Sequence, residues 1–222
     1  YTISGNDPKV YVVVLHFDLR GDIEVSNLRR AWHQAVIRHP VLRTFYLWKN
    51  REIPLQIIAR QCELPWQELD WHHLSAKAQE REFEKLFREE REQGFDLTRP
   101  PLMRLALVQT GPREHRFVCS VHHSILDGWS FTLLLEEVFA RYQAMCRGET
   151  LELQNSMPYK SYVTWLQEQD RTAAERYWRK TLRGISESAP LMIDEVPGSV
   201  QTAADTFEMR HFELSMPTMD AL

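Results

Sequence analysis

The chain has 222 residues, of which 43% are hydrophobic and 26% are charged, and its formal net charge is −4. This composition is typical of a soluble globular protein that can bury a substantial core, and the scattered basic residues argue against a surface for nucleic acid or an anionic membrane. The three cysteines lack the spacing of a disulfide framework or a metal site, so we expect a cytoplasmic protein.

The first part of the chain alternates predicted strands and helices. Residues 10–19 are mostly β-branched or aromatic and predict a strand that is buried on both faces. Apolar side chains at helical spacing predict a helix from residue 25 that ends at Pro40. Residues 41–48 and 53–59 predict two strands that pair across a short turn.

The middle of the chain predicts a helix, a hairpin and a second helix. Residues 76–93 predict a charged helix with an apolar inner face that ends at Gly94. Residues 102–109 and 116–121 predict strands, and the short connection between them favours an antiparallel hairpin. A strongly amphipathic helix is predicted to begin at Ser130, whose residue type favours the N-cap position.

The last part of the chain predicts less regular structure. Short helices are predicted within residues 159–170 and 173–184. Residues 186–206 are rich in Pro, Gly, Ser and Ala and predict a linker, which leads into a strand over 206–214. Taken together, the elements predict a mixed α/β (α+β) fold with a central, mostly antiparallel or mixed sheet flanked by helices.

The stretch "SVHHSILDGWS" combines reactive side chains where a predicted strand ends and a predicted helix begins. An imidazole such as that of His122 or His123 titrates near neutral pH and can accept a proton from a nucleophile. Asp127 can bend back to fix the loop or to pair with an arginine, and Gly128 leaves the backbone amides uncrowded. The N-terminus of the helix that opens at Ser130 can stabilise a developing negative charge.

These groups favour acyl transfer by a general base, without a nucleophile on the protein. The sequence contains no G-x-S-x-G elbow for a serine nucleophile, and no obvious partner activates a cysteine. If the chemistry is acyl transfer, the acceptor substrate itself is expected to attack.

Two other interpretations of the histidine pair remain open. The pair could have a purely structural role in a strand-to-helix loop, with its hydrogen-bonding groups satisfied by neighbouring groups. It could also bind zinc, although adjacent histidines in a strand point to opposite sides and no His or Cys cluster completes a coordination shell, so we predict no metal. A second pair, His72 and His73, lacks the Asp-Gly sequel and is interpreted as a surface loop.

The stretch "HHSILDGWS" resembles the signature of the condensation domains of nonribosomal peptide synthetases, within the chloramphenicol acetyltransferase-like superfamily. Four further segments are similar to segments of that family. They are "RHPVLRTFY" at 38–46, "FDLTRPPLMRLALV" at 95–108, "YKSYVTWLQ" at 159–167 and "AERYWRKTL" at 174–182. The resemblance implies a chloramphenicol acetyltransferase-like lobe built around the mixed sheet.

The resemblance assigns roles to the residues of the motif. It implies that His123 is the active-site imidazole and that His122 is structural. It also implies that Asp127 holds the loop through an ion pair with Arg38 or Arg43.

The end of the motif is implied to contact the substrate. Gly128 is expected to offer its backbone to the substrate, and Trp129 and Ser130 are expected to line or cap the same corner. A position for Trp129 in the plain hydrophobic core is the equally weighted alternative.

The family's activity is amide formation between two carrier-bound substrates. A donor carrier domain presents an acyl or peptidyl thioester on a phosphopantetheine arm, and an acceptor carrier domain presents an aminoacyl amine. No cofactor is expected to bind directly, and an adenylation domain of the same synthetase is a further implied partner. The alternatives are a free-standing acyltransferase of the wax-ester synthase or polyketide-associated type, which would use coenzyme A thioesters, and a non-catalytic module that docks carriers.

The sequence departs from the family pattern in extent. A full condensation domain is roughly twice as long as this chain. We expect residues 1–185 to form the N-terminal lobe, and residues 186–222 to form a linker and first strand that lead toward an absent C-terminal lobe. The fragment alone is therefore expected to be inactive or nearly so. Within the family, the D-G-W-S ending favours condensation over epimerisation, and the first histidine of the pair argues against heterocyclisation.

Overall fold

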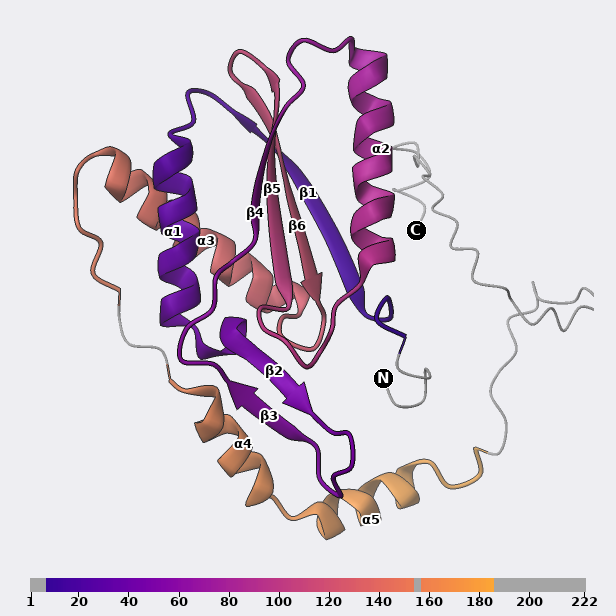
Figure 1. Ribbon diagram of the computed structural model, residues 1–222. Coiled ribbons are helices and arrows are strands. Elements are labelled where there is room, and N and C mark those ends of the chain that lie inside the picture. Colours follow the sequence, from indigo (N-terminus) through magenta and orange to yellow (C-terminus); the bar gives the residue numbers. More distant parts are fainter. Residues whose placement is uncertain (1–6, 154–156, 186–222) are drawn as a thin grey trace, which may run out of the picture. The chain divides into compact units, whose positions relative to one another are not determined.

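A computed structural model describes residues 7–153 and 157–185 (Figure 1). The chain divides into two compact units, Tyr1–Gln167 and Glu168–Leu222. The strands are β1 (Val12–Arg20), β2 (Thr44–Leu47), β3 (Leu55–Ile58), β4 (Trp66–Asp70), β5 (Met103–Gly111) and β6 (Glu114–His122). The helices are α1 (Val25–Arg38), the 3-10 helix η1 (Pro40–Arg43), α2 (Ala76–Gln93), α3 (Gly128–Cys146), α4 (Tyr159–Gln167) and α5 (Arg171–Thr181).

A four-stranded mixed sheet in the order β1-β6-β5-β4 forms the centre of the first unit. β5 and β6 pair antiparallel, which confirms the predicted hairpin, and β1 pairs antiparallel with the other side of β6. β4 runs parallel to β5, with Trp66 opposite Leu105. The mixed sheet flanked by helices that the sequence predicts is therefore confirmed, and β2 and β3 form the second predicted antiparallel pair.

The central sheet carries a separate hydrophobic core on each face, because successive side chains of a strand point to opposite sides. Along β5, Leu105 and Leu107 belong to the larger core, which α1 and α3 complete. Ala106 and Val108 face the other way, into a smaller core under α2. Figure 1 shows the same arrangement, with α2 on the opposite side of the sheet from α1 and α3.

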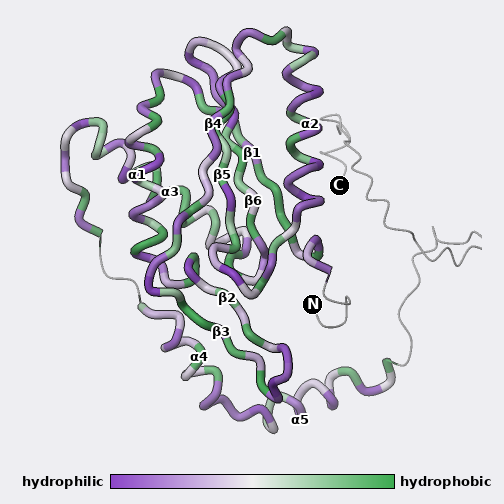
Figure 2. Tube along the Cα trace, in the orientation of Figure 1, coloured by the Kyte–Doolittle hydropathy of each residue, from purple (hydrophilic) through white to green (hydrophobic). Residues whose placement is uncertain are grey.

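The two helical layers differ in how apolar they are. Trp32 of α1 is 1% exposed and stacks on Phe117 of β6, with ring centroids 5.6 Å apart. Figure 2 colours most of α2 as hydrophilic, and only Phe83 and Leu86 of this helix are fully buried.

Gly94 follows α2 with a positive φ of 61°, and a Cβ there would lie 2.4 Å from the Pro8 carbonyl oxygen, so only glycine fits.

The structure corrects two predictions about strands and adds a strand that was not predicted. β1 is an edge strand without a fully buried residue, and its side chains alternate between exposed and half-buried from His16 to Arg20, so it is not buried on both faces. The segment predicted as a strand over 41–48 begins as the turn η1, because Pro40 favours the start of a helical turn. β4 was missed because it is short and its outward side chains are polar.

Several predictions near the end of the chain have different outcomes. The two short helices are present as α4 and α5. The predicted linker over 186–206 and strand over 206–214 lie outside the described residues. The expected boundary between residues 185 and 186 therefore stays a prediction, and the first compact unit ends earlier, at Gln167.

Candidate functional site

The histidine motif lies where β6 leaves the sheet and α3 begins. His122 is the last residue of β6, and α3 starts at Gly128. Ile125 and Leu126 of the connecting loop are buried in the larger core. The loop is therefore anchored by its apolar residues, which holds the polar side chains on either side of them at the surface.

His122 is a buried histidine whose ring is fixed from within the loop. It is 2% exposed, and its Nδ1 atom accepts a hydrogen bond from the Ser124 backbone N–H at 3.2 Å and lies 2.8 Å from Ser124 Oγ. An Nδ1 atom that accepts leaves the proton of the neutral ring on Nε2. Burial lowers the pKa of His122 below its usual value, although a hydrogen bond to the Val10 backbone opposes this effect. This environment fits the structural role that the sequence predicts.

His123 is exposed, and its ring has a defined tautomer. Its backbone N–H donates to the Tyr11 carbonyl at 2.8 Å, which ties the loop to the start of β1. Its Nδ1 atom lies 2.6 Å from the Leu126 carbonyl oxygen. Because a carbonyl can only accept, Nδ1 must carry the proton, and the lone pair of the neutral ring is then on Nε2. His123 therefore presents a proton acceptor at the surface.

Asp127, and not Ser130, is the N-cap of α3. Its Oδ1 atom accepts a hydrogen bond from the Ser130 backbone N–H at 2.7 Å, and its own carbonyl accepts from the Phe131 N–H. The side-chain hydrogen bond from Ser130 is the main cause that holds the pKa of Asp127 below its usual value. The helix consequently starts two residues earlier than predicted, and Ser130 occupies its first turn.

The expected ion pair between Asp127 and Arg38 or Arg43 is not formed among the residues that the structure describes. The Arg43 guanidinium donates instead to the carbonyls of Val36, at 3.0 Å, and of Ala59. It thereby ties the end of α1 to the residue that follows β3. The prediction is wrong because capping α3 engages the aspartate and backbone carbonyls engage Arg43.

Glu137 makes the ionic link between α3 and the segment at the end of α1. Its carboxylate lies 3.3 Å from Arg38 Nε, 2.9 Å from His39 Nε2 and, within α3, 3.0 Å from Arg141 Nε. Burial tends to raise the pKa of Glu137, but hydrogen bonds from His39 and Arg141 outweigh it and the net pKa is lowered. Sequence reasoning missed this residue. The sequence feature that could have indicated Glu137 is its position directly before Val138, which belongs to the apolar stripe of the helix.

The first turn of α3 exposes an apolar surface. Trp129 is 79% exposed, so the alternative that places it in the hydrophobic core is wrong. Leu133 lies one turn further along and is also exposed. A Cβ added at Gly128 would meet no atom within 4 Å, so nothing in the described chain requires glycine there. The contacts expected of Gly128, Trp129 and Ser130 with a substrate stay predictions.

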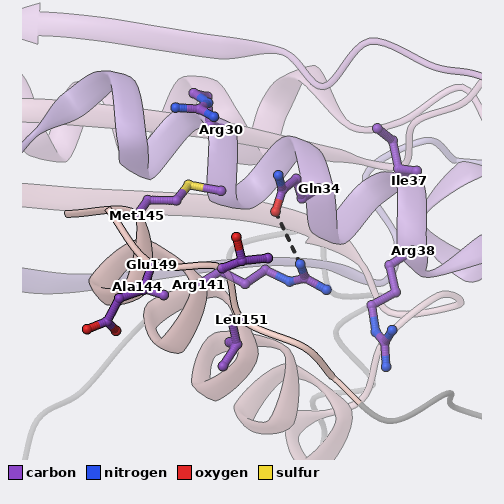
Figure 3. A pocket seen from close by; sticks show the side chains of 10 residues that line it. Arg30, Gln34, Ile37, Arg38, Arg141, Ala144, Met145, Glu149 and Leu151 are labelled. Carbon is purple, nitrogen blue, oxygen red and sulfur yellow. Dashed lines mark hydrogen bonds between the residues drawn. The ribbon is translucent and has the colours of Figure 1, made fainter. Parts of the chain in front are cut away.

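A hollow lies between α1 and the C-terminal end of α3, away from the motif (Figure 3). Its polar lining includes Arg30, Arg38, Glu149 and Arg141, which donates to Gln34 at 3.1 Å. Of the site residues expected from the sequence, only Arg38 lines it. This hollow therefore does not bring the motif residues together.

Comparison with known families identifies the domain. The family model of the condensation domain matches residues 2–221. The chain belongs to the condensation domain family. Chondramide synthase cmdD of Chondromyces crocatus is 40% identical over 185 residues, and bacitracin synthase 3 of Bacillus licheniformis is 33% identical over 191 residues. The two matches cover 83% and 86% of this chain but only 5% and 3% of those synthases.

Solved structures share the fold of this condensation domain chain. The starter condensation domain of the rhizomide synthetase RzmA aligns with a TM-score of 0.71 at 23% identity, over 84% of this chain and 45% of that one. The SgcC5 protein of Streptomyces globisporus aligns with a TM-score of 0.62 at 26% identity, over 78% of this chain and 40% of that one. The chain thus spans less than half the length of these two structures. Among the helices that the structure describes, none is long and apolar enough to cross a membrane.

Removing the cap of α3 should destabilise this condensation domain chain only modestly. We expect Asp127→Ala to lower the free energy of unfolding only slightly, because the exposed Asp127 side chain loses just its N-cap hydrogen bond from the Ser130 N–H. Asp127→Ser, which keeps a capping oxygen, should restore most of it. Urea denaturation of the 222-residue chain measures both values. A loss for Asp127→Ala as large as that expected for breaking a buried ion pair would contradict this account.

Stability should also depend on pH through the buried His122. Burial lowers the pKa of His122 in the folded protein, whereas a histidine in the unfolded chain has a pKa of about 6.5. At pH values just below 6.5, the unfolded state therefore binds more protons than the folded state. We expect constant stability above about pH 6.5 and a progressive loss below it. His122→Gln should flatten this loss, and His115, whose pKa burial also lowers, should account for what remains. His33→Gln, at an exposed site, is the control, and an unchanged slope in His122→Gln would refute the assignment.

Proposed function

We propose that this chain carries the active-site imidazole of an amide-forming condensation domain in nonribosomal peptide synthesis. The donor would be an acyl or peptidyl thioester on one carrier domain, and the acceptor would be an aminoacyl amine on another. The observation that supports this most is the 2.6 Å contact between His123 Nδ1 and the Leu126 carbonyl oxygen, from which the tautomer of the ring is inferred. Its Nδ1–H is engaged by the Leu126 carbonyl, so that the Nε2 lone pair is available at the exposed end of β6.

The chemical step needs no covalent bond to the protein. The amine nitrogen of the acceptor attacks the thioester carbonyl carbon, a C–N bond forms and the C–S bond breaks. The proton that the amine loses ends on the leaving thiolate, which gives an amide and a free thiol on the donor arm. Nε2 of His123 can accept the amine N–H in a hydrogen bond or take the proton and return it. The α3 N-terminus can stabilise charge on the carbonyl oxygen.

The partners proposed for this reaction follow from the same chemistry. A donor and an acceptor carrier domain would each supply a phosphopantetheine arm, and an adenylation domain would load an amino acid onto a carrier. A C-terminal lobe of the same domain would supply the other wall of the substrate tunnel, and the exposed Trp129 and Leu133 offer apolar contact area at the start of α3, the helix that follows the His123 loop. We place the protein in the cytoplasm, in line with its three free cysteines, Cys62, Cys119 and Cys146.

The deciding experiment uses the complete parent synthetase module. Both carriers are loaded, and intact-protein mass spectrometry follows the mass of the acceptor carrier. The proposal expects the acyl group to move to the acceptor only when both substrates are carrier-bound. Transfer from a coenzyme A thioester to an alcohol would favour the free-standing acyltransferase instead, and no transfer with either donor would favour a docking module. The 222-residue chain added in place of the full domain should give little or no amide, and robust transfer would overturn that expectation.

A further inference from the structure

The turn between β4 and α2 brings three possible metal ligands together. Asp70 is the last residue of β4, and His72 and His73 follow it directly in the turn. One ligand atom from each of the three lies within 4.8 Å of the others, and all three residues are exposed. We propose that Asp70, His72 and His73 bind one divalent transition-metal ion of the borderline class, such as Ni²⁺ or Zn²⁺.

The ligand atoms already lie close together, and two of the residues are hydrogen-bonded. Asp70 Oδ1 accepts a hydrogen bond from the His72 backbone N–H at 3.1 Å and also hydrogen-bonds with His72 Nδ1. The His72 and His73 rings are nearly perpendicular, at 85°, with centroids 5.8 Å apart. Ligand atoms on a tetrahedral metal with bonds of about 2.0–2.2 Å are about 3.3–3.6 Å apart. Rotations of the exposed side chains can close the remaining distance.

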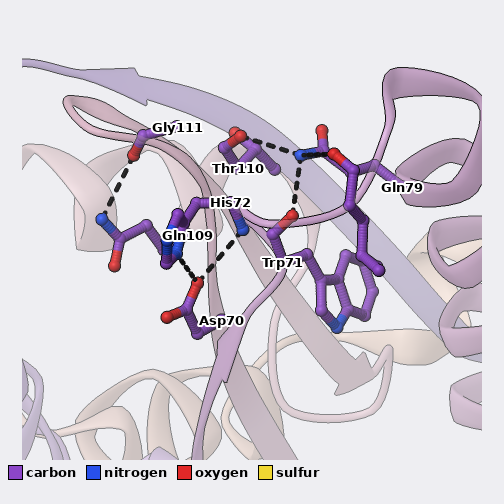
Figure 4. A network of polar contacts seen from close by, with 8 residues as sticks. Asp70, Trp71, His72, Gln79, Gln109, Thr110 and Gly111 are labelled. Atoms are coloured by element: carbon purple, nitrogen blue, oxygen red, sulfur yellow. Dashed lines mark hydrogen bonds and ion pairs between the residues drawn. The ribbon is translucent and has the colours of Figure 1, made fainter.

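The backbone that carries these ligands is fixed to the sheet, as Figure 4 shows. The Nε2 atom of Gln79, from α2, lies within hydrogen-bonding distance of the carbonyls of Trp71, Leu74 and Thr110, at 2.9, 3.4 and 2.8 Å. The Trp71 N–H also donates to the Gln109 carbonyl of β5 at 2.9 Å. The turn is therefore held before any ion arrives, which lowers the entropy that binding must overcome.

The donor set decides which metal fits. Two imidazole nitrogens and one carboxylate suit Ni²⁺, Cu²⁺, Zn²⁺ and Co²⁺, whereas Mg²⁺ and Ca²⁺ prefer oxygen ligands. The three protein ligands leave the remaining coordination positions to water. When the ion binds, the proton on His72 Nδ1 moves to Nε2, and the hydrogen bond to Asp70 gives way to two bonds to the metal. The sequence alone indicated a surface loop for His72 and His73 and did not point to Asp70. Asp70 was missed because β4, the strand that ends at this residue, was not predicted.

This site and the proposed catalytic histidine lie at opposite ends of the central sheet. Asp70 pairs with Gln109 at one end of β5, and Met103 at the other end of β5 pairs with Val121, two residues before His123. Gln109 lies six residue steps beyond Met103 along the strand, a length of about 20 Å. Metal binding can therefore be tested without reference to the proposed reaction, and either idea can fail alone.

Isothermal titration calorimetry of the untagged 222-residue chain with NiCl₂ and with ZnCl₂ tests the site. We expect one equivalent to bind, with affinity at least about tenfold weaker in His72→Ala, His73→Ala and Asp70→Asn. His33→Ala removes an exposed histidine on α1 and should bind as the wild type does. Visible absorption of the Co²⁺ form should show the bands of a nitrogen- and oxygen-liganded ion in the wild type and lose them in His73→Ala.

Three results would overturn the proposal. The first is no heat of binding from either metal at millimolar concentration. The second is unchanged stoichiometry and affinity in both His72→Ala and His73→Ala. The third is a loss of binding in His123→Ala that equals the loss in His73→Ala, because the ion would then use the other histidine pair. The substituted side chains are exposed, so circular dichroism should show unchanged folding in each variant.

Discussion

Replacing His123 by alanine should slow amide formation by the complete condensation domain by about 10²–10⁴-fold, the range that a positioned general base contributes. The substitution removes the Nε2 lone pair and leaves the loop in place. The backbone N–H of residue 123 keeps its hydrogen bond to the Tyr11 carbonyl, and the buried Ile125 and Leu126 still anchor the loop. Single-turnover transfer between loaded carriers, followed by mass spectrometry, measures the rate.

Two variants separate proton transfer from positioning. His123→Gln can still hydrogen-bond the acceptor amine but cannot take its proton at neutral pH, so a rate near that of His123→Ala indicates a true base. A rate near that of the wild type indicates a positioning residue. Transfer that persists unchanged in His123→Ala would contradict the proposal and would favour a docking or scaffold role for the motif. His33→Ala, on the exposed face of α1, is the matched control.

Replacing Glu137 by alanine should destabilise the fold far more than removing the carboxylate of Asp127. The Glu137 side chain is 14% exposed, and those of its partners Arg38, His39 and Arg141 are 20%, 24% and 13% exposed. Breaking a fully buried ion pair costs about 3–5 kcal/mol because it leaves an uncompensated charge. Since these side chains keep some contact with water, we expect a loss of about 2–3 kcal/mol from the free energy of unfolding.

Urea denaturation of Glu137→Ala, Glu137→Gln and Asp127→Ala in parallel tests this ranking. Glu137→Gln keeps the shape and the hydrogen-bond acceptor but not the charge, so its loss should lie between the other two. If Asp127→Ala proved the more damaging substitution, the link between α1 and α3 would have to run through Asp127, as the sequence resemblance implied. A glutamate-to-alanine change at the exposed Glu136, the neighbouring residue of α3, controls for helix propensity and should alter stability by less than about 0.5 kcal/mol.

Local patterns predicted the fold well where they were strong. The β5–β6 hairpin followed from two apolar runs with a short connection, and α1 followed from the helical spacing around Trp32. β4 could not be recognised in the same way. Its parallel partner β5 is distant in the chain, and "WQELD" places exposed Gln and Glu side chains on an edge strand, which gives little alternation to detect.

The candidate site shows the same division between local and tertiary information. The position of the motif between a strand and a helix was predictable from the sequence, and the structure shows that His123 and Trp129 are both exposed there. The partners of the charged groups were not predictable. Asp127 caps α3 through a local hydrogen bond, while Glu137 reaches Arg38 only because α1 packs against α3, and that packing is a tertiary property.

The central claim is that His123 keeps its proton on Nδ1 and presents the Nε2 lone pair to the site. Long-range ¹H–¹⁵N correlation NMR of the 222-residue chain at about pH 8, where a histidine is neutral, distinguishes the two nitrogens directly. His123→Ala assigns the signals. The claim predicts a protonated Nδ1 and an unprotonated Nε2 at this residue. A proton on Nε2, with an unprotonated Nδ1, would contradict the hydrogen bond to Leu126 and with it the proposed role of the ring.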